Sequence, residues 1–188
     1  MLSNDGRYSG WLSEQQWESA ISTLPIPCVD FVPVRRDSCG AIAMVGIILR
    51  NSPFNDVPAW CHLGGRVLRG ETIATSIRRH AYDAFGRDCP MAIPPAPRHA
   101  TVFEWFPDYL APTKDGHSDT YVFGTDPRKH AISMGFIVEA EEGLSVRPGG
   151  EALDFAWAEP SELDSYAMWP GSREFIYRLL DDGHALQR

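Results

Sequence analysis

The sequence predicts an α/β domain of the mixed α+β kind, in which helices pack on a sheet. A chain of 188 residues with 44% hydrophobic content is long enough to bury one core. Its patterns run in the order helix, two strands, helix, several strands and helix, which is typical of α+β folds. We therefore expect a single domain over residues 1–188.

The first predicted helix covers about residues 13–22. Ser13 is followed three residues later by Gln16, the spacing of a capping box, and Leu12 and Trp17 stand where a hydrophobic staple would pair. Pro25 lies just beyond this segment and prevents the helix from continuing.

Two apolar, β-branched runs follow, at residues 28–36 and 41–50. A polar turn at 37–40 separates them, so we expect a hairpin or two neighbouring strands. Pro33 lies inside the first run and predicts an edge position or a bulge there, because proline cannot donate to a sheet ladder.

A glycine turn and a second helix are predicted over residues 64–86. Gly64 and Gly65 allow a tight bend and a close approach of the backbone to a ligand. Glu71 stands where a carboxylate favours the start of a helix, and the apolar residues after it recur at near-helical spacing. Gly86 marks the expected end of the helix.

The rest of the chain predicts four more strands and a last helix. The strands are expected at residues 101–106, 119–124, 130–140 and 153–158. The helix is expected at about 172–182, ending at Gly183.

Composition excludes several classes of function. The net charge of −8 argues against general binding of nucleic acid, which requires a basic surface. No apolar run approaches the length of about 20 residues that spans a bilayer, and the first residues lack the profile of a signal peptide. We expect a cytoplasmic protein with no membrane partner. The four cysteines form no CxxC pair, which predicts reduced thiols rather than a zinc site or disulfides.

The glycine turn and second helix resemble the Nudix box of the Nudix hydrolase family. Gly65, Glu71, Arg79 and Gly86 all fall in the register of that motif. The resemblance implies a Nudix fold, with a mixed central sheet between helices. The box is degenerate, because His80, Asp83 and Ala84 stand where the motif has glutamates.

The resemblance also implies a metal site, which this sequence alters. Family members hold Mg²⁺ or Mn²⁺ against a diphosphate with the box carboxylates, since hard cations prefer oxygen ligands. Here the implied ligands are Glu71, His80, Asp83 and the carbonyl of Gly64. In family members, the glutamate that corresponds to Glu71 often stabilises the loop rather than binding the metal. The alternative is that His80 and Asp83 form a solvated or mutually paired helix face without metal.

Outside the box, the chain is similar to the GDP-mannose mannosyl hydrolase branch of the family, loosely and over most of residues 11–180. That similarity implies that Arg50 and Arg66 bind the diphosphate, as planar guanidinium groups do. It places a general base at His130, a residue type whose pKa lies near working pH. The alternatives are that both arginines are ordinary surface residues, and that His99 or His117 is the base.

These observations predict a Nudix-type hydrolase of a nucleoside diphosphate linked to another group, with a nucleotide sugar as the favoured substrate. A divalent cation would act as Lewis acid. One alternative is a catalytically silent module that binds a nucleotide or a protein partner, and another is a repurposed site with metal-free chemistry. The similar branch also implies a homodimer, for which Trp11 and Trp17 would suit the contact.

Overall fold

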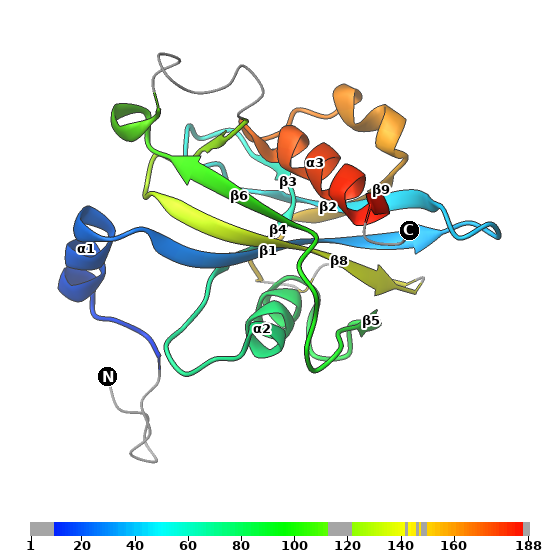
Figure 1. Ribbon diagram of the computed structural model, residues 1–188, viewed down its shortest axis with the longest axis horizontal. Coiled ribbons are helices and arrows are strands. Elements are labelled where there is room, and N and C mark those ends of the chain that lie inside the picture. The colour runs from blue at the N-terminus through cyan, green and yellow to red at the C-terminus, as the bar shows by residue number, and fades with distance from the viewer. Residues whose placement is uncertain (1–9, 113–121, 142, 146, 148–149, 186–188) are drawn as a thin grey trace.

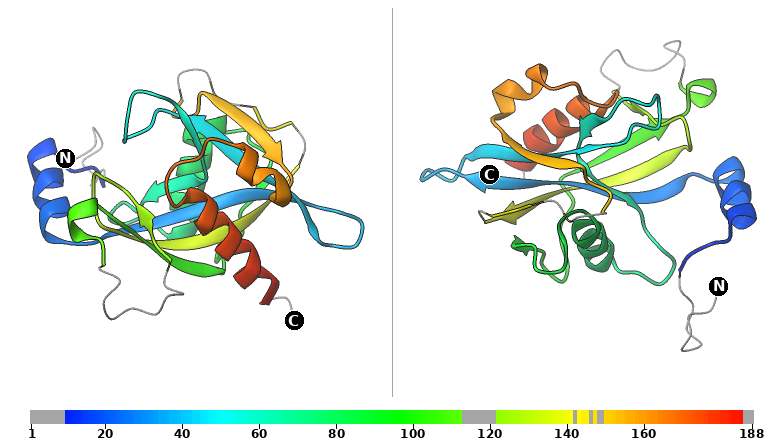
Figure 2. Two further views of the ribbon diagram at one scale, coloured as in Figure 1. Left: turned by 90° about the horizontal axis from the view of Figure 1, so that it is seen from above. Right: turned by 180° about the vertical axis from the view of Figure 1, so that it is seen from behind.

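The computed structural model describes residues 10–112, 122–141, 143–145, 147 and 150–185 of the chain. One mixed sheet runs through the centre, α2 covers one face and α3 covers the other (Figures 1 and 2). This arrangement confirms the predicted α+β class. In the part of the chain described, no helix is both long enough and apolar enough to cross a membrane.

The elements have the following bounds. The helices are α1 (Glu14–Thr23), α2 (Ile73–Phe85) and α3 (Ser172–Ala185), with 3-10 turns at η1 (Asp108–Leu110) and η2 (Pro160–Ser165). The strands are β1 (Ile26–Arg36), β2 (Ile42–Arg50), β3 (Ala59–Cys61), β4 (Leu63–Arg66), β5 (Met91–Ala92), β6 (Thr101–Phe106), β7 (Gly124–Thr125), β8 (Ala131–Ala140) and β9 (Asp154–Ala158).

The sheet is built around two long central strands, β1 and β8. These pair in parallel from Ile26 opposite Ala131 to Val34 opposite Glu139. The main path is β3-β2-β1-β8-β6-β7, while β4 pairs with β1, β5 with β8 and β9 with β2. Since β6 and β7 are parallel and the remaining pairs are antiparallel, the sheet is mixed.

The predicted hairpin is confirmed, but the predicted edge or bulge at Pro33 is wrong. β1 is an interior strand, and its register shift falls later, between Arg35 and Arg36. On the side away from β8, β1 pairs with β4 through Phe31 and with β2 from Val34 onward. Pro33 lies in the gap between these two partners. Its missing N–H therefore leaves no ladder bond unmade on that side.

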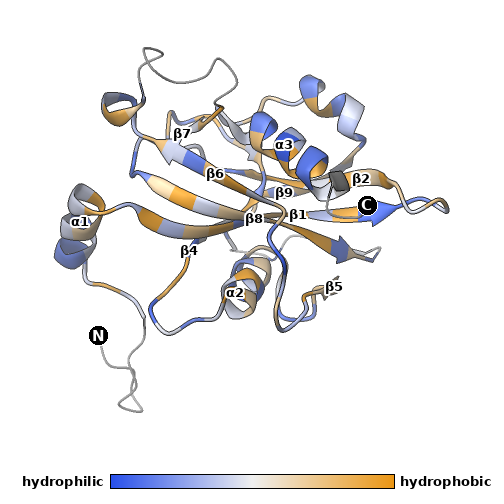
Figure 3. Ribbon diagram, viewed as in Figure 1, coloured by the Kyte–Doolittle hydropathy of each residue, from blue (hydrophilic) through white to orange (hydrophobic). Residues whose placement is uncertain are grey.

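Side chains alternate between the two faces of the sheet, and the core therefore has two layers. Apolar residues are concentrated in the central strands β1 and β8 (Figure 3). Even-numbered residues of β1 pack on the α3 side, and odd-numbered residues pack on the α2 side. The α3 layer includes Ile26, Cys28, Val32, Val34, Phe175, Ile176 and Leu179. The α2 layer includes Val29, Phe31, Ile77, Ala81 and Ala84. Each helix thus buries one apolar stripe against one face of the sheet.

Two predicted boundaries differ from the structure. The last helix continues through Gly183 to Ala185, because Gly183 packs against Ile137 rather than ending the helix. A Cβ at Gly183 would lie 2.5 Å from Ile137 Cδ1, so a larger residue would have to displace the end of that side chain. In the strand expected at 119–124, residues 119–121 lie outside the described part of the chain, Val122 and Phe123 are not in a strand, and Gly124 begins the short β7.

The α3 layer provides a test of the packing. We expect Ile176→Ala, at a side chain that is 0% exposed, to lower the free energy of unfolding by about 2–5 kcal/mol. The matched change Ile132→Ala, on a residue of β8 that is 40% exposed, should cost less than about 1 kcal/mol. Urea unfolding of both variants measures the difference. Equal losses would contradict the assignment of the α3 layer as core.

Candidate functional site

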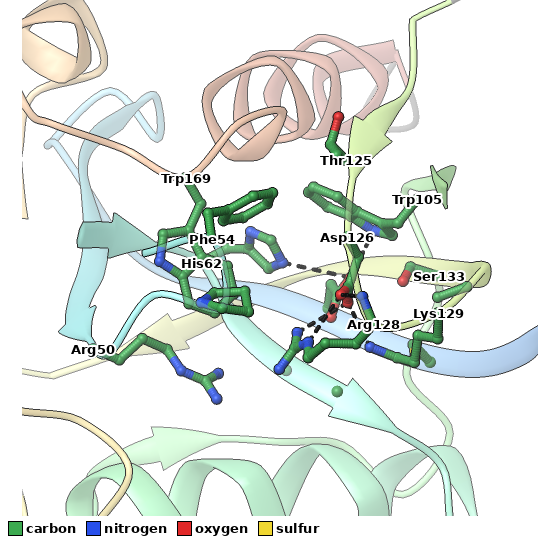
Figure 4. Close-up of a pocket in the computed structure, with 16 residues that line it drawn as sticks. Arg50, Phe54, His62, Trp105, Thr125, Asp126, Arg128, Lys129, Ser133 and Trp169 are labelled. Atoms are coloured by element: carbon green, nitrogen blue, oxygen red, sulfur yellow. Dashed lines mark hydrogen bonds and ion pairs between the residues drawn. The ribbon is translucent and has the colours of Figure 1, made fainter. Parts of the chain in front are cut away.

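A pocket opens at one end of the sheet, on the α3 side and beside Gly64 and Gly65 of β4 (Figure 4). Counted with its open mouth it has a volume of about 480 Å³. One wall carries Arg50, Phe54, His62 and Trp169, and the other carries Thr125, Asp126, Arg128 and Lys129. Strands β1, β6 and β8 contribute Cys28, Asp30, Trp105, Ala131 and Ser133.

A cluster of three charges forms the wall between β7 and β8. Asp126 accepts hydrogen bonds from Arg128 Nε at 2.8 Å, Arg128 Nη2 at 2.9 Å and Lys129 Nζ at 2.6 Å. Burial alone would raise the pKa of Asp126, but these two cations outweigh it and lower the pKa to about 2. Two cations on one carboxylate leave a net positive charge beside the pocket.

The opposite wall is organised by Arg50 and Trp169. The guanidinium of Arg50 lies 5.1 Å from the ring centroid of Trp169, and that of Arg128 lies 5.7 Å from the same ring. Arg50 also pairs with Glu151, with 3.2 Å between Nη2 and Oε2. The cation-π contacts hold both guanidinium groups at the pocket, so their charge is positioned before any ligand arrives.

The floor of the pocket is a buried polar network around Asp30. The Asp30 carboxylate accepts a hydrogen bond from Trp105 Nε1 at 3.2 Å, and His62 Nε2 lies 3.5 Å away. Burial would raise the pKa of Asp30, but His62 outweighs this effect and the pKa is lowered. Ser172 Oγ accepts the backbone N–H of His62 at 3.1 Å and lies 2.8 Å from His62 Nδ1. In the tautomer in which Ser172 donates to Nδ1, the proton of His62 is on Nε2 and faces Asp30.

This Ser172, His62 and Asp30 array is part of the scaffold. Ser172 is fully buried at the start of α3 and does not line the pocket, so no substrate reaches its hydroxyl. The His62 ring stacks on Trp105 at a centroid distance of 5.1 Å. The network thus fixes Trp105 and one carboxylate oxygen of Asp30 at the base of the pocket.

Trp169 Nε1 is a buried polar atom of the lining that lacks a hydrogen-bond partner among the described residues. The hydroxyl of Ser133, a residue that is 0% exposed, lies beside Asp30 and helps to lower the pKa of that carboxyl group. Buried polar groups are nearly always hydrogen-bonded in folded proteins. The position of Trp169 Nε1 indicates a pocket whose polar contacts are completed by a ligand or by water.

The retained positions of the Nudix-like motif hold the loop before α2 in place. Glu71 Oε1 accepts from Arg79 Nε at 2.7 Å, and Oε2 accepts from Arg79 Nη2 and from the backbone N–H of Leu68, both at 2.9 Å. Arg79 also donates to the carbonyl of Arg66 at 2.8 Å. Burial would raise the pKa of Glu71, but the hydrogen bond from Arg79 outweighs it and the pKa is lowered. Both oxygens of Glu71 are therefore engaged in the loop.

His80 is turned into the protein, which makes the alternative of a solvated helix face wrong for this residue. It is 7% exposed, and its ring packs against Gly65, where a Cβ would lie 2.8 Å from His80 Cε1. Its Nε2 lies 3.3 Å from the carbonyl of Arg66. Burial lowers the pKa of His80 to about 4, so the ring is neutral at pH 7. Asp83 is half-buried, and Ala84 is fully buried.

These donors do not fit the divalent cation that the family resemblance implies. Glu71 is bound to Arg79, His80 is buried under β4, and Ala84 offers no ligand, which leaves Asp83. Within the described residues no group of three or more His, Cys, Asp or Glu side chains is arranged to hold a metal ion. A divalent cation requires several oxygen ligands at once.

The other predicted site residues are divided between two places. Arg50 lines the pocket, as expected of a ligand-binding residue. Arg66 does not, because its guanidinium lies 4.5 Å from the ring centroid of Trp11 and 4.1 Å from that of Trp17, facing α1. Gly64 lines the pocket from within β4. The predicted tight bend at Gly64 and Gly65 is wrong, because both residues lie in this strand and pair with Asp30 and Val29 of β1. Asp83 lies on the solvent side of α2, in a separate groove.

His130 also lies away from the pocket, although its neighbours Lys129 and Ala131 line it. Its ring stacks on Phe106 at a centroid distance of 4.4 Å, and its Nε2 lies 3.9 Å from Glu104 Oε1. Of the competing histidines, His99 is exposed on a loop and His117 lies outside the described residues.

Sequence reasoning missed most of the pocket. Asp30 carried a usable signal, since a lone acidic residue inside an apolar strand must find partners when it is buried. The run Asp126, Arg128 and Lys129 carried a weaker one, as a compact charge cluster before a strand. Trp169 and Glu151 carried no local signal, because only the tertiary fold brings them to Arg50.

Comparison with solved structures shows that the protein has the Nudix fold. A possible asymmetric diadenosine tetraphosphate hydrolase from Jonesia denitrificans is 27% identical, with a TM-score of 0.70 over 87% of this chain and 98% of that one. The Nudix domain of NrtR from Shewanella oneidensis, complexed with ADP ribose, is 11% identical, with a TM-score of 0.55 over 94% of this chain and 100% of that one. A bifunctional NMN adenylyltransferase/ADP ribose pyrophosphatase from Francisella tularensis, complexed with AMP and a Mn ion, is 19% identical, with a TM-score of 0.59 over 90% of this chain and 45% of that one.

The sequence also places the chain in a protein family. A family model described as a domain of unknown function, DUF4916, matches residues 7–176, and the chain belongs to this family. No curated protein matches the chain. The narrower resemblance to the GDP-mannose mannosyl hydrolase branch remains a prediction.

The buried His80 predicts a loss of stability in mild acid. Its pKa is about 4 in the folded protein and 6.5 unperturbed, so the unfolded chain binds the extra proton first. The folded state should lose on the order of 3 kcal/mol as pH falls from about 7 to 4. Urea unfolding across this range measures the loss. In His80→Gln the loss over this window should largely disappear, whereas the exposed control His99→Gln should keep it. An unchanged slope in His80→Gln would contradict the assignment.

Proposed function

We propose that the protein binds and hydrolyses a nucleoside diphosphate linked to another group, and that the pocket beside Gly64 and Gly65 is the site. One observation carries the proposal. Three cationic side chains and several aromatic rings line the same hollow. An anionic ligand with a planar ring is the chemistry that such a lining recognises.

The cationic side chains are suited to the diphosphate. Arg50 and Arg128 come from opposite walls, and Lys129 lies beside Arg128. Guanidinium groups bind phosphate oxygens in a bidentate way, and an ammonium adds a point charge. Gly64 and Gly65 carry no side chains, so phosphate oxygens can approach the backbone there.

The apolar part of the lining is suited to the nucleoside. Phe54 and Trp169 lie edge to face at a centroid distance of 6.3 Å, and Trp105 stands opposite them (Figure 4). Flat rings bury a nucleobase or a sugar face with little loss of side-chain entropy. Nε1 of Trp169 is available to hydrogen-bond the polar edge of such a ligand.

Glu151 is our candidate for the general base. It pairs with Arg50, its Oε1 is buried without a hydrogen-bond partner among the described residues, and burial raises its pKa. A carboxylate with a raised pKa can take a proton from water at neutral pH. Neither Glu151 nor His130 is itself a lining residue, but Glu151 contacts the lining residue Arg50, whereas His130 faces Glu104, which is outside the lining. No step of this proposal uses a metal ion, since the donors on α2 do not fit one.

The comparisons support the substrate class and leave the particular substrate open to test. The structures named above include proteins described as a diadenosine tetraphosphate hydrolase and an ADP ribose pyrophosphatase. ADP ribose and a nucleotide sugar share the diphosphate flanked by a nucleoside and a sugar. Both are therefore probes for this pocket, with a nucleotide sugar as the specific prediction. A homodimer through α1 stays part of the proposal.

A silent binding module is the second candidate. It is favoured by the ion pairs of Arg50, Arg128 and Lys129, which already neutralise part of the pocket charge. Such a pocket can hold a diphosphate without driving the departure of a charged leaving group.

Arg50→Ala tests the pocket. We expect it to weaken binding of ADP ribose and GDP-mannose about 10- to 100-fold in a calorimetric titration, because a charge-assisted hydrogen bond is worth about 1.5–3 kcal/mol. Arg36→Ala is the matched control, since Arg36 pairs with Glu139 outside the pocket. If neither nucleotide binds the wild-type protein, or if both variants bind equally, the pocket is wrongly assigned.

Glu151→Gln tests turnover. We expect nucleotide binding to persist, while release of mononucleotide, followed by chromatography, falls at least about 100-fold, the usual contribution of a general base. Binding without any product from the wild-type protein would instead select the silent module. Full activity in Glu151→Gln would exclude this residue as the base.

A further inference from the structure

The solvent side of α2 forms a second concave surface, which we call the α2 groove. Counted with its open side it has a volume of about 1140 Å³. Its charged lining consists of Arg78, Arg79, Arg87 and Arg147, with Glu71 and Asp83. Four guanidinium groups against two carboxylates make this groove positive, in a chain whose net charge is −8.

The positive charge in the groove is only partly neutralised. Arg79 is paired with Glu71. Arg78 donates to the carbonyl of Ile93 at 2.7 Å, which positions its guanidinium and leaves the charge uncancelled. Arg87 and Arg147 are exposed and have no ion pair with any residue that the structure describes. Asp83 is the one remaining carboxylate of the lining to balance these three arginines.

Arg147 is held at the groove by backbone contacts. Its N–H donates to the carbonyl of Ala84 at 2.7 Å, at the end of α2. Gly150 packs so closely on α2 that a Cβ there would lie 2.3 Å from the carbonyl oxygen of Asp83. Arg147 and Gly150 therefore rest on the helix at the position where the Nudix motif has its last glutamate, here Ala84.

The groove and the pocket meet at Glu151. Its carboxyl group interacts electrostatically with Arg50 and Arg128 of the pocket, and with Asp83 and Arg79 of the groove. Glu151 thus lies within electrostatic range of both sets of arginines, and it contacts Arg50 at 3.2 Å.

From this charge distribution we infer that the α2 groove binds phosphate groups of the ligand directly, and that guanidinium groups stand where the family resemblance implies a divalent cation. The inference rests on the proposed function for the identity of the ligand. The ligand class is an oligophosphate, free or as part of a nucleotide. Arginine binds such oxygens in a bidentate way and needs no carboxylate ligands. The same positive charge repels Mg²⁺ and Mn²⁺, for which the groove supplies too few oxygen donors.

The test uses inorganic pyrophosphate and the full chain, with EDTA present. We expect pyrophosphate to bind the wild-type protein without metal. The double substitution Arg87→Ala and Arg147→Ala should weaken that binding at least about 10-fold, since charge-assisted hydrogen bonds are lost. Arg178→Ala is the matched control and should bind as the wild type does, because Arg178 lies on α3 and pairs with Asp182. Equal urea midpoints would show that the variants are folded.

Three results would overturn the inference. The first is pyrophosphate affinity that is unchanged in the double variant. The second is binding of pyrophosphate only after Mg²⁺ or Mn²⁺ is added. The third is sub-millimolar binding of either cation alone that is lost in Asp83→Ala. Each is measured by calorimetry on the same samples.

The two proposals fail separately in this experiment. If ADP ribose or GDP-mannose binds in an Arg50-dependent way while pyrophosphate ignores the groove variants, the α2 groove is wrongly assigned and the proposed function stands. If pyrophosphate responds to the groove variants while no nucleotide binds, the groove stands as an oligophosphate site and the proposed function fails.

Discussion

The parallel pairing of β1 with β8 is the constraint on which the rest of the structure depends. It joins segments about a hundred residues apart, and its register decides which side chains of both strands face α3. Asp30 of β1 and Ser133 of β8 reach the same pocket because of that register. The pairing of β8 also positions the turn before it, and Arg128 and Lys129 of that turn line the pocket. A shift of one residue would point the opposite set of side chains at α3.

In the segment at residues 64–86, the side chains that match the Nudix motif have a structural role and do not line the pocket. The positions that match the Nudix motif, Glu71 and Arg79, bind each other and the backbone of the loop. The glycine at 65 leaves room for the ring of His80. These contacts explain how the loop-helix geometry is kept although the carboxylates of the motif are absent. A retained motif is therefore evidence for the geometry of this segment, and the chemistry depends on the residues that face the ligand.

Net charge and local charge differ in this protein. The chain is acidic overall, yet the pocket wall and the α2 groove gather arginines and a lysine. Local positive potential of this kind attracts small anions, while the negative charge elsewhere opposes the approach of a polyanion such as nucleic acid. The buried carboxylates Asp30 and Asp126 are held ionised by neighbouring histidine, arginine and lysine groups. Buried charges in this protein thus occur where the fold places a group of opposite charge beside them.

The sequence by itself determined the α+β class, the capping box of α1, the β1–β2 hairpin, the end of α2, and the position of β6. These features depend on contacts within a few residues, and their patterns are visible along the chain. The tertiary structure alone decided which side chains meet. It placed Lys129 in the pocket and His130 outside it, it took Arg66 to the rings of Trp11 and Trp17, and it brought Glu151 to Arg50. Strand register and long-range packing set those contacts, and no local pattern encodes them.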